Sequence, residues 1–377
     1  MRVCFLEDTN LHGGTQIWVT EAARVFMESG VDVTVLTPGT GYVAKTLDGS
    51  GARIVTYDYD AVTSGSDEQD AIWADAFRDS DVAVCTVHPP RDGFHCAVFA
   101  GGVIKKHGLN TVLIPKTGTI VPEYLREYYA PVEGIRNKVI AITDFTREYL
   151  VDHYGLPDDM VSLVYQGTEV DRFTRDPSRV DEARSRYPVP EGAGPILGNV
   201  GSFEERKGQV VLLEAVNEVR ESLPGVHLIL VGDGPDEAML KDRVESMGLQ
   251  SHVSFFPFTN EPQYVFEAID ILVLSSLYKE GLPNVLLEAM SMELPVVSSR
   301  MAGVPEVVFN GETGYMVEPG DVEGLAAAIA RTWSDQDAYR KMAAEARRLM
   351  EQNFDKKVQF KAFIEYFEGV LSEYAAG

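Results

Sequence analysis

A short segment of the chain joins a buried strand to a helix through a loop that suits an anion. The apolar run Ile271–Ser276 is typical of a strand that is buried on both faces. Pro283 is favoured in the first turn of a helix, which we expect to extend over Asn284–Met292. The free N–H groups and the positive end of the helix dipole attract an anion there, and Gly281 lets a ligand approach the backbone. The segment therefore predicts an anion-binding loop.

Two carboxylates frame this loop. Glu280 is in the loop itself, and Glu288 lies inside the helix, where side chains lean back toward the N-terminus. Carboxylates do not bind phosphate, but they accept hydrogen bonds from hydroxyl groups. The pattern suits a ligand with phosphate at its centre and hydroxyl-rich groups at both ends, which is the composition of a nucleotide-sugar. The alternative is that Glu280 is a solvated loop charge and Glu288 an ordinary helical residue.

A second loop carries the positive charge that such a ligand requires. It covers Gly201–Gln209 and follows the first strand of the second half of the chain. Arg206 and Lys207 come just before a helix, where cations are unfavourable for the helix dipole. An anionic ligand would remove that conflict, so the pair predicts a diphosphate site. A solvated basic pair is the alternative.

The composition limits the kinds of partner. The chain has 377 residues, 45% of them hydrophobic and 24% charged, which fits a globular protein of two domains. Its formal net charge is −25 at pH 7, which disfavours nucleic acid and makes membrane contact unexpected. The same acidity would also suit a salt-adapted host.

The sequence predicts a cytoplasmic protein. No apolar run is long enough to cross a bilayer, and the chain begins with a strand pattern rather than a signal peptide. Cys4, Cys85 and Cys96 lack the spacing of metal ligands and fit buried, reduced thiols.

Strand patterns separated by helix-sized patterns run through both halves of the chain. In the first half we expect strands at Val3–Leu6, Val31–Leu36, Arg53–Tyr57, Val82–Val87, Thr111–Ile114, Val139–Ile142 and Val161–Val164. In the second half we expect them at Ile196–Val200, Val226–Val231, Val253–Phe256 and Ile271–Ser276, before an almost wholly helical tail. This order predicts an α/β fold of two doubly wound parallel sheets, with ligands at the carboxyl ends of the strands.

The segment around the two carboxylates resembles the signature of the family-4 retaining glycosyltransferases, which have the GT-B fold of two facing Rossmann-like domains. The matching stretches are EGLPNVLLEAMSMELPVVSS, then GVPEVV with Gly303 and Glu306, then NGETGYMVEPGD. Glu293 departs from the family, which usually has Gly there. The resemblance implies transfer of a hexosyl unit from a nucleoside-diphosphate sugar to an acceptor hydroxyl, with retention at the anomeric carbon and without a cofactor. No metal is expected, on the ground that no Asp-x-Asp cluster is placed at a strand end.

The resemblance also implies a division of labour along the chain. It places an acceptor-binding domain at residues 1–170, a linker at 171–195, a nucleotide-sugar domain at 196–353 and a helix at 354–377 that returns to the first domain. The donor-binding residues that it implies are Gly13, Gly14, Gly201, Arg206, Lys207, Gly232, Phe258, Glu280, Gly281, Leu282, Pro283, Asn284, Val285, Leu286 and Glu288. A UDP-sugar is slightly favoured over a GDP-sugar.

Two family positions carry different residues here. Ser202 stands where the family has an Arg that binds the diphosphate, and Arg206 could take over that role. The family His of the catalytic site is replaced by Lys116 or Thr117, depending on the alignment. Arg206, Lys207, Glu280, His88 and Lys116 are the candidate catalytic residues. The acceptor-binding candidates are Thr15, Gln16, His88, Lys116, Thr117 and Tyr124.

The sequence leaves other functions open. A nucleotide-sugar epimerase shares the architecture but needs acid–base groups at the sugar, for which His88 is the one good candidate. A catalytically silent sugar-nucleotide-binding subunit is the other alternative, because the family His and Arg are missing. The expected acceptor is a small soluble polyol such as a sugar or cyclitol, since no polybasic segment is visible. A homodimer is open as well.

Overall fold

The chain folds into two compact units in the computed structural model, which describes residues 1–10, 13–87, 95–118 and 123–376. Unit 1 contains Met1–Tyr165 together with Gln359–Gly377, and unit 2 contains Gln166–Val358. The division after Tyr165 lies slightly before the expected boundary at 170, and the segment expected as a linker, 171–195, lies within unit 2.

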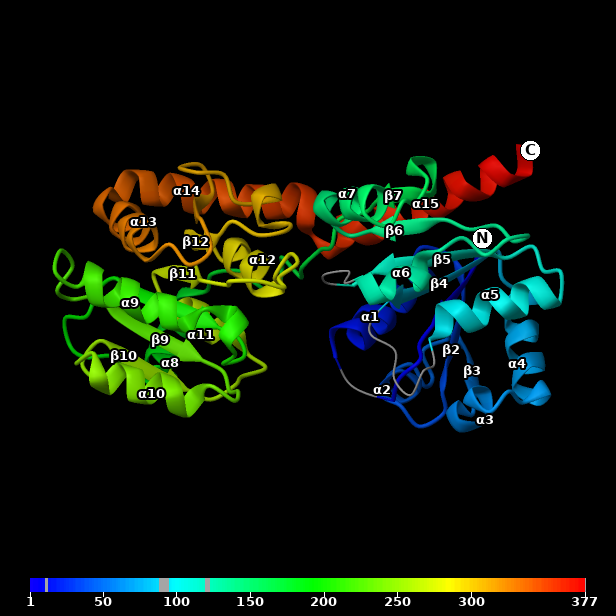
Figure 1. Ribbon diagram of the computed structural model, residues 1–377, viewed down its shortest axis with the longest axis horizontal. Coiled ribbons are helices and arrows are strands. Elements are labelled where there is room, and N and C mark those ends of the chain that lie inside the picture. Colours follow the sequence, from blue (N-terminus) through cyan, green and yellow to red (C-terminus); the bar gives the residue numbers. More distant parts are fainter. Residues whose placement is uncertain (11–12, 88–94, 119–122, 377) are drawn as a thin grey trace. The chain divides into compact units, whose positions relative to one another are not determined.

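Unit 1 is built on a seven-stranded parallel sheet with the order β3-β2-β1-β4-β5-β6-β7 (Figure 1). Its strands are β1 (Arg2–Leu6), β2 (Asp32–Pro38), β3 (Arg53–Tyr57), β4 (Val82–Val87), β5 (Val112–Thr117), β6 (Val139–Ala141) and β7 (Val161–Leu163). Its helices are α1 (Gly14–Glu28), α2 (Tyr42–Thr46), α3 (Tyr59–Thr63), α4 (Asp67–Arg78), α5 (Cys96–Lys106), α6 (Arg126–Tyr129) and α7 (Asp144–Asp152). The chain reverses direction across the sheet between β1 and β4, as in doubly wound folds.

Alternate residues of the central strands enter two different cores. Val3 and Phe5 of β1 belong to a cluster with α1, whereas Cys4 and Leu6 belong to a cluster with α4 and α5. This follows from the two-residue period of a strand, which points successive side chains to opposite faces. Both faces are covered, so the strands read as continuous apolar runs in the sequence.

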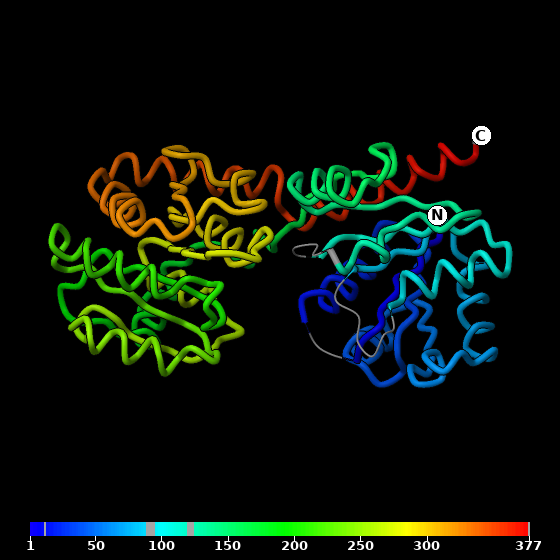
Figure 2. The backbone as a smooth tube through the Cα atoms, in the orientation of Figure 1, coloured from blue at the N-terminus to red at the C-terminus, as the bar shows by residue number. Residues whose placement is uncertain are grey.

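The last helix of the chain belongs to unit 1 from Gln359 onward. This helix, α15 (Lys356–Ala376), lies beside the elements of the first unit, as its red colour shows in Figure 2. Phe363 lies 5.3 Å from Trp18 between ring centroids, and Phe367 lies 5.9 Å from Phe26. The predicted return of the C-terminal helix to the first domain is therefore confirmed, and aromatic packing against α1 holds it there.

Unit 2 has a six-stranded parallel sheet with the order β10-β9-β8-β11-β12-β13. Its strands are β8 (Ile196–Val200), β9 (His227–Val231), β10 (Val253–Phe256), β11 (Ile271–Leu274), β12 (Val296–Ser299) and β13 (Gly314–Val317). Its helices are α8 (Val180–Arg186), α9 (Gln209–Val219), α10 (Glu237–Ser246), α11 (Pro262–Ala268), α12 (Asn284–Ser291), α13 (Val322–Ser334) and α14 (Gln336–Leu349). A π-helical turn (Met350–Phe354) follows α14.

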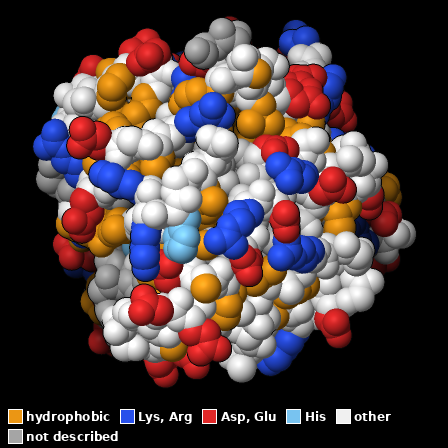
Figure 3. All heavy atoms as spheres, turned by 90° about the vertical axis from the view of Figure 1, so that its right-hand side faces the viewer, with side chains coloured by type: hydrophobic (Ala, Val, Ile, Leu, Met, Phe, Trp, Pro, Cys, Tyr) orange, Lys and Arg blue, Asp and Glu red, His pale blue; other side chains and the backbone are white. Residues whose placement is uncertain are grey.

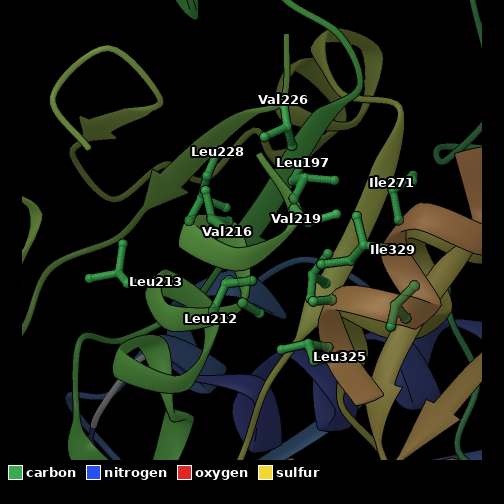
Figure 4. Close-up of a cluster of buried hydrophobic side chains, with 14 of the residues drawn as sticks. Leu197, Leu212, Leu213, Val216, Val219, Val226, Leu228, Ile271, Leu325 and Ile329 are labelled. Carbon is green, nitrogen blue, oxygen red and sulfur yellow. The ribbon is translucent and has the colours of Figure 1, made fainter. Parts of the chain in front are cut away.

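Apolar side chains from two helices cover one face of this second sheet. Figure 4 shows Val216 and Val219 of α9 and Ile329 of α13 packed over Leu197 of β8 and Ile271 of β11. All five side chains are at most 3% exposed. The predicted fold class, two doubly wound parallel sheets, is thus confirmed. Two strands were not predicted, β12 and β13. Each has only four residues and follows a loop or turn, so its pattern in the sequence is weak.

Charged side chains on the surface are mixed rather than gathered by sign. On the face drawn in Figure 3, Lys and Arg are interspersed with Asp and Glu. The basic group at the end of α5 is partly neutralised, because Asp70 Oδ2 lies 2.6 Å from His107 Nε2 and 3.1 Å from Lys106 Nζ. Within the described ranges, no helix combines the length and the apolarity that crossing a bilayer requires.

The backbone conformation at the C-terminal end of α12 explains why the family usually has Gly at the position of Glu293. Leu294 N–H donates to Ala289 O over 3.1 Å, and Glu293 N–H donates to Met290 O over 3.2 Å. These two bonds form a Schellman motif, whose residue after the C-cap takes the left-handed conformation. Glu293 occupies that position with a φ of +55° and an exposed side chain. The family's usual Gly would adopt this conformation without steric strain.

We predict that Glu293→Gly stabilises the protein. The left-handed conformation costs a non-Gly residue about 1–2 kcal/mol, and the greater freedom of Gly in the unfolded chain offsets part of that gain. The free energy of unfolding of unit 2 should rise by about 0.5–1 kcal/mol. Denaturant titration measures it. Glu293→Ala is the control, because Ala keeps the strain; equal stability of the Gly and Ala variants would contradict the explanation.

Candidate functional site

The loops at the carboxyl ends of β8 and β9 make close backbone contacts at glycine residues. A Cβ on Gly232 would lie 2.0 Å from Gly201 O, and one on Gly234 would lie 2.3 Å from Phe203 O. Gly201 N–H donates to Val231 O, and Phe203 N–H donates to Asp233 O over 2.7 Å. Gly232 and Gly234 therefore let two strand-end loops pack backbone to backbone, and Gly201 supplies the carbonyl that Gly232 approaches while its own φ of +155° favours glycine. This packing explains Gly201 and Gly232 without a ligand, although their backbones remain at the predicted edge of the sheet.

The loop after β8 is also fixed to the end of β11. It contains the 3₁₀ turn Glu205–Lys207 and then Gly208, whose φ is +64°. A Cβ on Gly208 would lie 2.1 Å from Ser275 O, so only Gly fits. Ser275 Oγ donates to Lys207 O over 3.1 Å, and Leu277 N–H donates to Arg206 O over 2.8 Å. The backbone of both cationic residues is thus held beside the loop of Glu280.

Glu280 lies at the centre of a charged cluster. Its carboxylate accepts hydrogen bonds from Lys207 Nζ at 2.8 and 2.9 Å and from Ser276 Oγ at 3.2 Å. Arg206 Nη1 lies 3.5 Å from the same carboxylate, while Arg206 Nε donates to Glu204 over 2.8 Å. Glu280 is only 8% exposed, so this pairing offsets much of the desolvation cost of its charge. The structure therefore brings the candidate residues Arg206, Lys207 and Glu280 together.

Ser202 has a short uncharged side chain that hydrogen-bonds to Glu204. Hydrogen bonds from Ser202 and then Arg206 lower the pKa of Glu204 below its usual value. The guanidinium of Arg206 thus occupies the space between Glu204 and Glu280. This arrangement supports the idea that Arg206 supplies the charge that Ser202 lacks.

The first turn of α12 is open to an anion. Pro283 is its N-cap residue, no side chain caps the turn, and the turn contains no acidic residue. Leu286 N–H donates to Pro283 O over 3.1 Å, so the N–H groups before Leu286 are the ones left at the positive end of the dipole. Leu282 and Leu286 have buried side chains, so only their backbone could meet a ligand. The first turn of α12 thus has the features expected of an anion-binding loop, and Asn284 is exposed at its start.

Glu288 differs sharply from Glu280. Burial raises the pKa of its carboxyl to about 7, although Arg172 and Lys356 nearby act in the opposite direction. Among the residues that the structure describes, none donates a hydrogen bond to this carboxyl. A half-buried carboxylate without donors is costly, and hydroxyl groups of a ligand would stabilise its charged form. This is the environment expected of a group that binds ribose hydroxyls.

Phe258 is exposed beyond the end of β10. Its side chain is 63% exposed, which is unusual for a ring of that size. The following loop is held by Arg172, whose Nη2 donates to Asn260 O over 3.3 Å. An exposed ring on an anchored loop is suited to stacking on a nucleobase.

In unit 1 the glycine loop leads into α1, but Gln16 faces the interior. Gly13 is the N-cap of α1, and Gly14 is its first residue, with no side-chain cap. Gln16 is buried and donates from Nε2 to Glu7 Oε1 over 2.9 Å. Burial raises the pKa of Glu7, so Gln16 and Thr9 compensate a buried carboxyl. Gln16 thus has a structural partner, and Thr15 is the more accessible of the two acceptor candidates.

Lys116 is buried at the end of β5. Its side chain is 5% exposed, its Nζ lies 4.4 Å from the centroid of the Trp18 ring, and it donates weakly to Thr117 O. Burial lowers the pKa of Lys116 to about 7. Thr117 is fully buried and accepts the N–H of Ile142 through Oγ1. The side chains of Lys116 and Thr117 therefore pack inside unit 1. The third acceptor candidate of this region, Tyr124, is 62% exposed and accessible to a ligand.

Two sequence expectations remain to be compared with the structure: the role of His88 and the lack of a metal site. His88 falls outside the described residues. One group with metal-ligand atoms exists within the described ranges, formed by Asp8, His95 and Cys96, whose ligand atoms lie within 4.8 Å of one another. Asp8 Oδ2 accepts the N–H of Cys96, and His95 Nδ1 accepts the N–H of Ala97. Both bonds cap the first turn of α5, which gives the cluster a structural role, and we assign it no metal.

The expectation that no Asp-x-Asp cluster is placed at a strand end is wrong, because Asp58 and Asp60 form one just after β3, but the structure gives it a structural role. Asp58 Oδ1 accepts the N–H of Ala61 and so caps α3. We assign this pair no metal either.

Sequence reasoning missed Gln166 as a neighbour of the donor loop. Its Nε2 donates to Leu282 O over 2.9 Å and lies 2.5 Å from Asn284 Oδ1. Gln166 lies in the segment YQGTEVDRF, which resembles a family segment that usually has Asn at this position. The contact spans more than a hundred residues of sequence, so no local pattern could have revealed it.

Two family models match the chain. Residues 181–349 match "Glycosyl transferases group 1", and residues 12–172 match "Glycosyltransferase Family 4". A lipopolysaccharide core biosynthesis glycosyltransferase of Rhizobium meliloti is 32% identical over 52% of this chain and 56% of its own length. A GDP-mannose-dependent phosphatidylinositol monomannoside mannosyltransferase of Mycolicibacterium smegmatis is 28% identical over 61% of this chain and 62% of its own. The chain thus spans less than two thirds of these curated relatives.

Solved structures resemble the whole chain. Anabaena HepE in complex with UDP has a TM-score of 0.83 and 19% identity, covering 98% of this chain and 100% of its own. A glycosyltransferase from Rickettsia africae has the same TM-score and identity, with 98% of both chains covered. At this identity the likeness concerns the fold, and it agrees with the two family models. The chain therefore belongs to the family-4 glycosyltransferases and has the GT-B fold.

Proposed function

We propose that the protein is a retaining hexosyltransferase that uses a nucleoside-diphosphate sugar and a small hydroxylated acceptor. One observation carries the proposal. The cationic pair Arg206 and Lys207, the first turn of α12 and the carboxyl of Glu288 lie within one unit, near the ends of the neighbouring strands β8 and β11. None of the described residues donates a hydrogen bond to the Glu288 carboxyl, whose pKa burial raises to about 7. These features match the diphosphate and the ribose of the same ligand.

The proposed reaction exchanges one bond at the anomeric carbon. The bond from this carbon to the diphosphate oxygen breaks, and a bond to the acceptor oxygen forms on the same face of the sugar. The proton of the acceptor hydroxyl passes to an oxygen of the departing phosphate, so no carboxylate nucleophile is needed. Lys207, Arg206 and the dipole of α12 stabilise the charge that develops on the diphosphate, and their positions are fixed before the reaction begins.

In this proposal Glu280 both orients Lys207 and accepts hydrogen bonds from the transferred sugar. It holds Lys207 in place through both carboxylate oxygens, and the same carboxylate lies where hydroxyls of the transferred sugar would approach. Glu288 would hold the ribose, and Phe258 would stack on the base. UDP is slightly favoured as the nucleotide; HepE of Anabaena has been solved with UDP and UDP-glucose, whereas the mycolicibacterial relative is named as GDP-mannose-dependent.

A donor panel tests the function directly. The protein is incubated with UDP-, GDP- and ADP-sugars and a set of polyol acceptors, and free nucleotide and products are measured. Release of nucleotide together with a glycoside of retained configuration is the expected result. Formation of an epimer without an acceptor would establish an epimerase instead, and binding without turnover would indicate a silent subunit.

We predict that the affinity for the nucleotide depends on the protonation of Glu288. Its pKa of about 7 means that most of the carboxyl is protonated at pH 6 and ionised at pH 8. Ribose hydroxyls donate to the ionised form, so affinity should rise with pH and fall about tenfold between pH 8 and pH 6. Calorimetry with UDP and GDP measures it.

The matched control is Glu288→Gln, which keeps the shape but cannot ionise. Because the nucleotide's own phosphate titrates equally for both proteins, the ratio of the two dissociation constants isolates the contribution of Glu288. The variant should bind weakly at every pH. A ratio that stays constant from pH 6 to pH 8 would contradict the assignment of this carboxyl to the ribose.

We predict that Lys207→Ala lowers turnover more than it raises the apparent donor constant. Negative charge on the diphosphate is greatest in the transition state, so the loss should fall on kcat, by about 100- to 1,000-fold. Arg206→Ala should act in the same direction. Lys241→Ala is the control, since Lys241 is an exposed lysine in the same unit that pairs with Glu237.

One combination of results would overturn the role of Arg206. If Arg206→Ala has normal kinetics while Ser202→Arg raises activity, then Arg206 does not replace the missing Arg. The Ser202→Arg variant places the family side chain at its usual position, so it tests the substitution independently of Arg206.

We predict a soluble acceptor rather than a membrane-bound one. Anchoring to an anionic membrane takes several basic residues, each contributing about 1 kcal/mol. The basic end of α5 is paired with Asp70, and charges of both signs are interspersed on the face in Figure 3. The protein should remain in the supernatant when it is centrifuged with anionic liposomes at low salt. Salt-reversible co-sedimentation would point to a lipid-linked acceptor.

A further inference from the structure

Both ends of α12 contact one segment of the chain, Gln166–Asp176, which we call the brace segment. At the N-terminal end, Gln166 Nε2 donates to Leu282 O over 2.9 Å and lies 2.5 Å from Asn284 Oδ1. Leu282 precedes the helix, and Asn284 is its first residue. One side-chain amide therefore fixes the approach of the loop to the helix.

At the C-terminal end, two arginines satisfy carbonyl groups. Arg175, in the brace segment, donates from Nε to Met292 O over 2.9 Å. Arg347, in α14, has its Nη1 2.6 Å from Ser291 O. The last carbonyls of a helix lack partners within it and carry the negative end of the dipole, so cations stabilise this end.

Arg347 also joins α12 to the brace segment. Its Nη1 lies 3.1 Å from Val170 O, 2.8 Å from Phe173 O and 3.1 Å from Thr174 Oγ1. Its side chain is 16% exposed and forms an additional ion pair with Glu351 at 2.6 Å. A single guanidinium thus fastens three elements: α14, the brace segment and the end of α12.

The brace segment is itself held firmly. Thr168 forms a short parallel bridge with Asp355, in which Thr168 N–H donates to Phe354 O over 2.8 Å. At its other end Asp176 N–H donates to the buried carboxylate of Glu267 over 2.7 Å, and Arg175 pairs with the same carboxylate. The contacts at the two ends of α12 therefore rest on fixed supports.

This arrangement matters because α12 is short. It has 8 residues, which at about 1.5 Å per residue is a length of about 12 Å, and so short a helix is not stable on its own. Its first turn faces the proposed diphosphate site, and it also carries Glu288. A displacement of a binding group by about 1 Å can cost about 100-fold in rate, so the support of α12 affects the chemistry.

We propose that Gln166, Arg175 and Arg347 are positioning residues of the donor site. They hold α12 at both ends, so that its first turn and Glu288 meet the diphosphate and the ribose of one nucleotide. This inference rests on the proposed function and deepens it. It also gives a role to Gln166, which stands where the family usually has Asn: the longer side chain reaches both Leu282 O and Asn284.

Arg347→Met tests the C-terminal support. Met has a similar length without charge or donors. Arg348→Met is the matched control, because Arg348 is the next residue of α14, is exposed, and pairs only with Glu345 among the described residues. At a temperature where circular dichroism shows all proteins folded, UDP or GDP should bind about tenfold more weakly to Arg347→Met, and turnover at saturating donor should fall by a similar factor. The control should stay within about twofold.

Gln166→Met tests the N-terminal support, with Gln336→Met as a control on the surface of α14. The loop that Gln166 holds faces the phosphates, so affinity for the nucleoside diphosphate should fall several-fold while affinity for the nucleoside alone stays unchanged. If Gln166 were merely structural, Gln166→Met would lower the unfolding temperature but leave the ratio of the nucleoside diphosphate affinity to the nucleoside affinity as it is in the wild type.

The outcomes distinguish a failure of the proposed function from a failure of the positioning role. If the wild type binds no nucleoside diphosphate, the proposed function fails and the positioning role fails with it. If the wild type binds and both Arg347→Met and Gln166→Met bind equally well with normal turnover, the positioning role alone is overturned. Partial recovery of affinity in Arg347→Lys, which keeps a cation near Ser291 O, would support the role.

Discussion

The ion pair between Lys207 and Glu280 is the contact on which the candidate site depends. It joins the loop after β8 to the loop after β11, two segments separated by more than seventy residues of sequence. A carboxylate as buried as that of Glu280 is costly without a partner, so the pair also fixes how closely the two loops approach. Gly208 permits that approach, because any side chain there would collide with Ser275 O. The cation is thereby held in place before any ligand binds.

The two carboxylates of the motif show how the same residue type acquires different roles. Glu280 has its charge compensated by Lys207, Arg206 and Ser276, so it is part of the protein's own framework. Glu288 receives no hydrogen bond from the described residues, and burial raises its pKa to about 7. The first is therefore suited to orienting a cation, and the second to receiving hydroxyl groups from a ligand. Spacing in the sequence could not distinguish them, since the difference comes from neighbours that are distant along the chain.

The sequence predicted what depends on local pattern and missed what depends on tertiary contact. Apolar runs separated by helical patterns identified the two parallel sheets, and the loop at Glu280–Asn284 was placed correctly before a helix. The burial of Lys116 beneath Trp18 could not be read from β5 alone, because it depends on how α1 crosses the sheet. The strain at Glu293 was visible only as a departure from the family, and the backbone conformation supplied its physical cause.

The donor helix illustrates why such a site needs the whole of unit 2. A helix of two turns has too few internal hydrogen bonds to keep its position, yet its N-terminal dipole is useful only if it points at a fixed place. The fold resolves this by supporting α12 from outside, with an amide at one end and two guanidinium groups at the other. The cations at the C-terminus also stabilise the helix electrostatically, in the same sense as an anion at its N-terminus would. A nucleotide bound at the N-terminus would therefore stabilise the same helix that the arginines stabilise at its C-terminus, and the interaction at either end would strengthen the arrangement that the other requires.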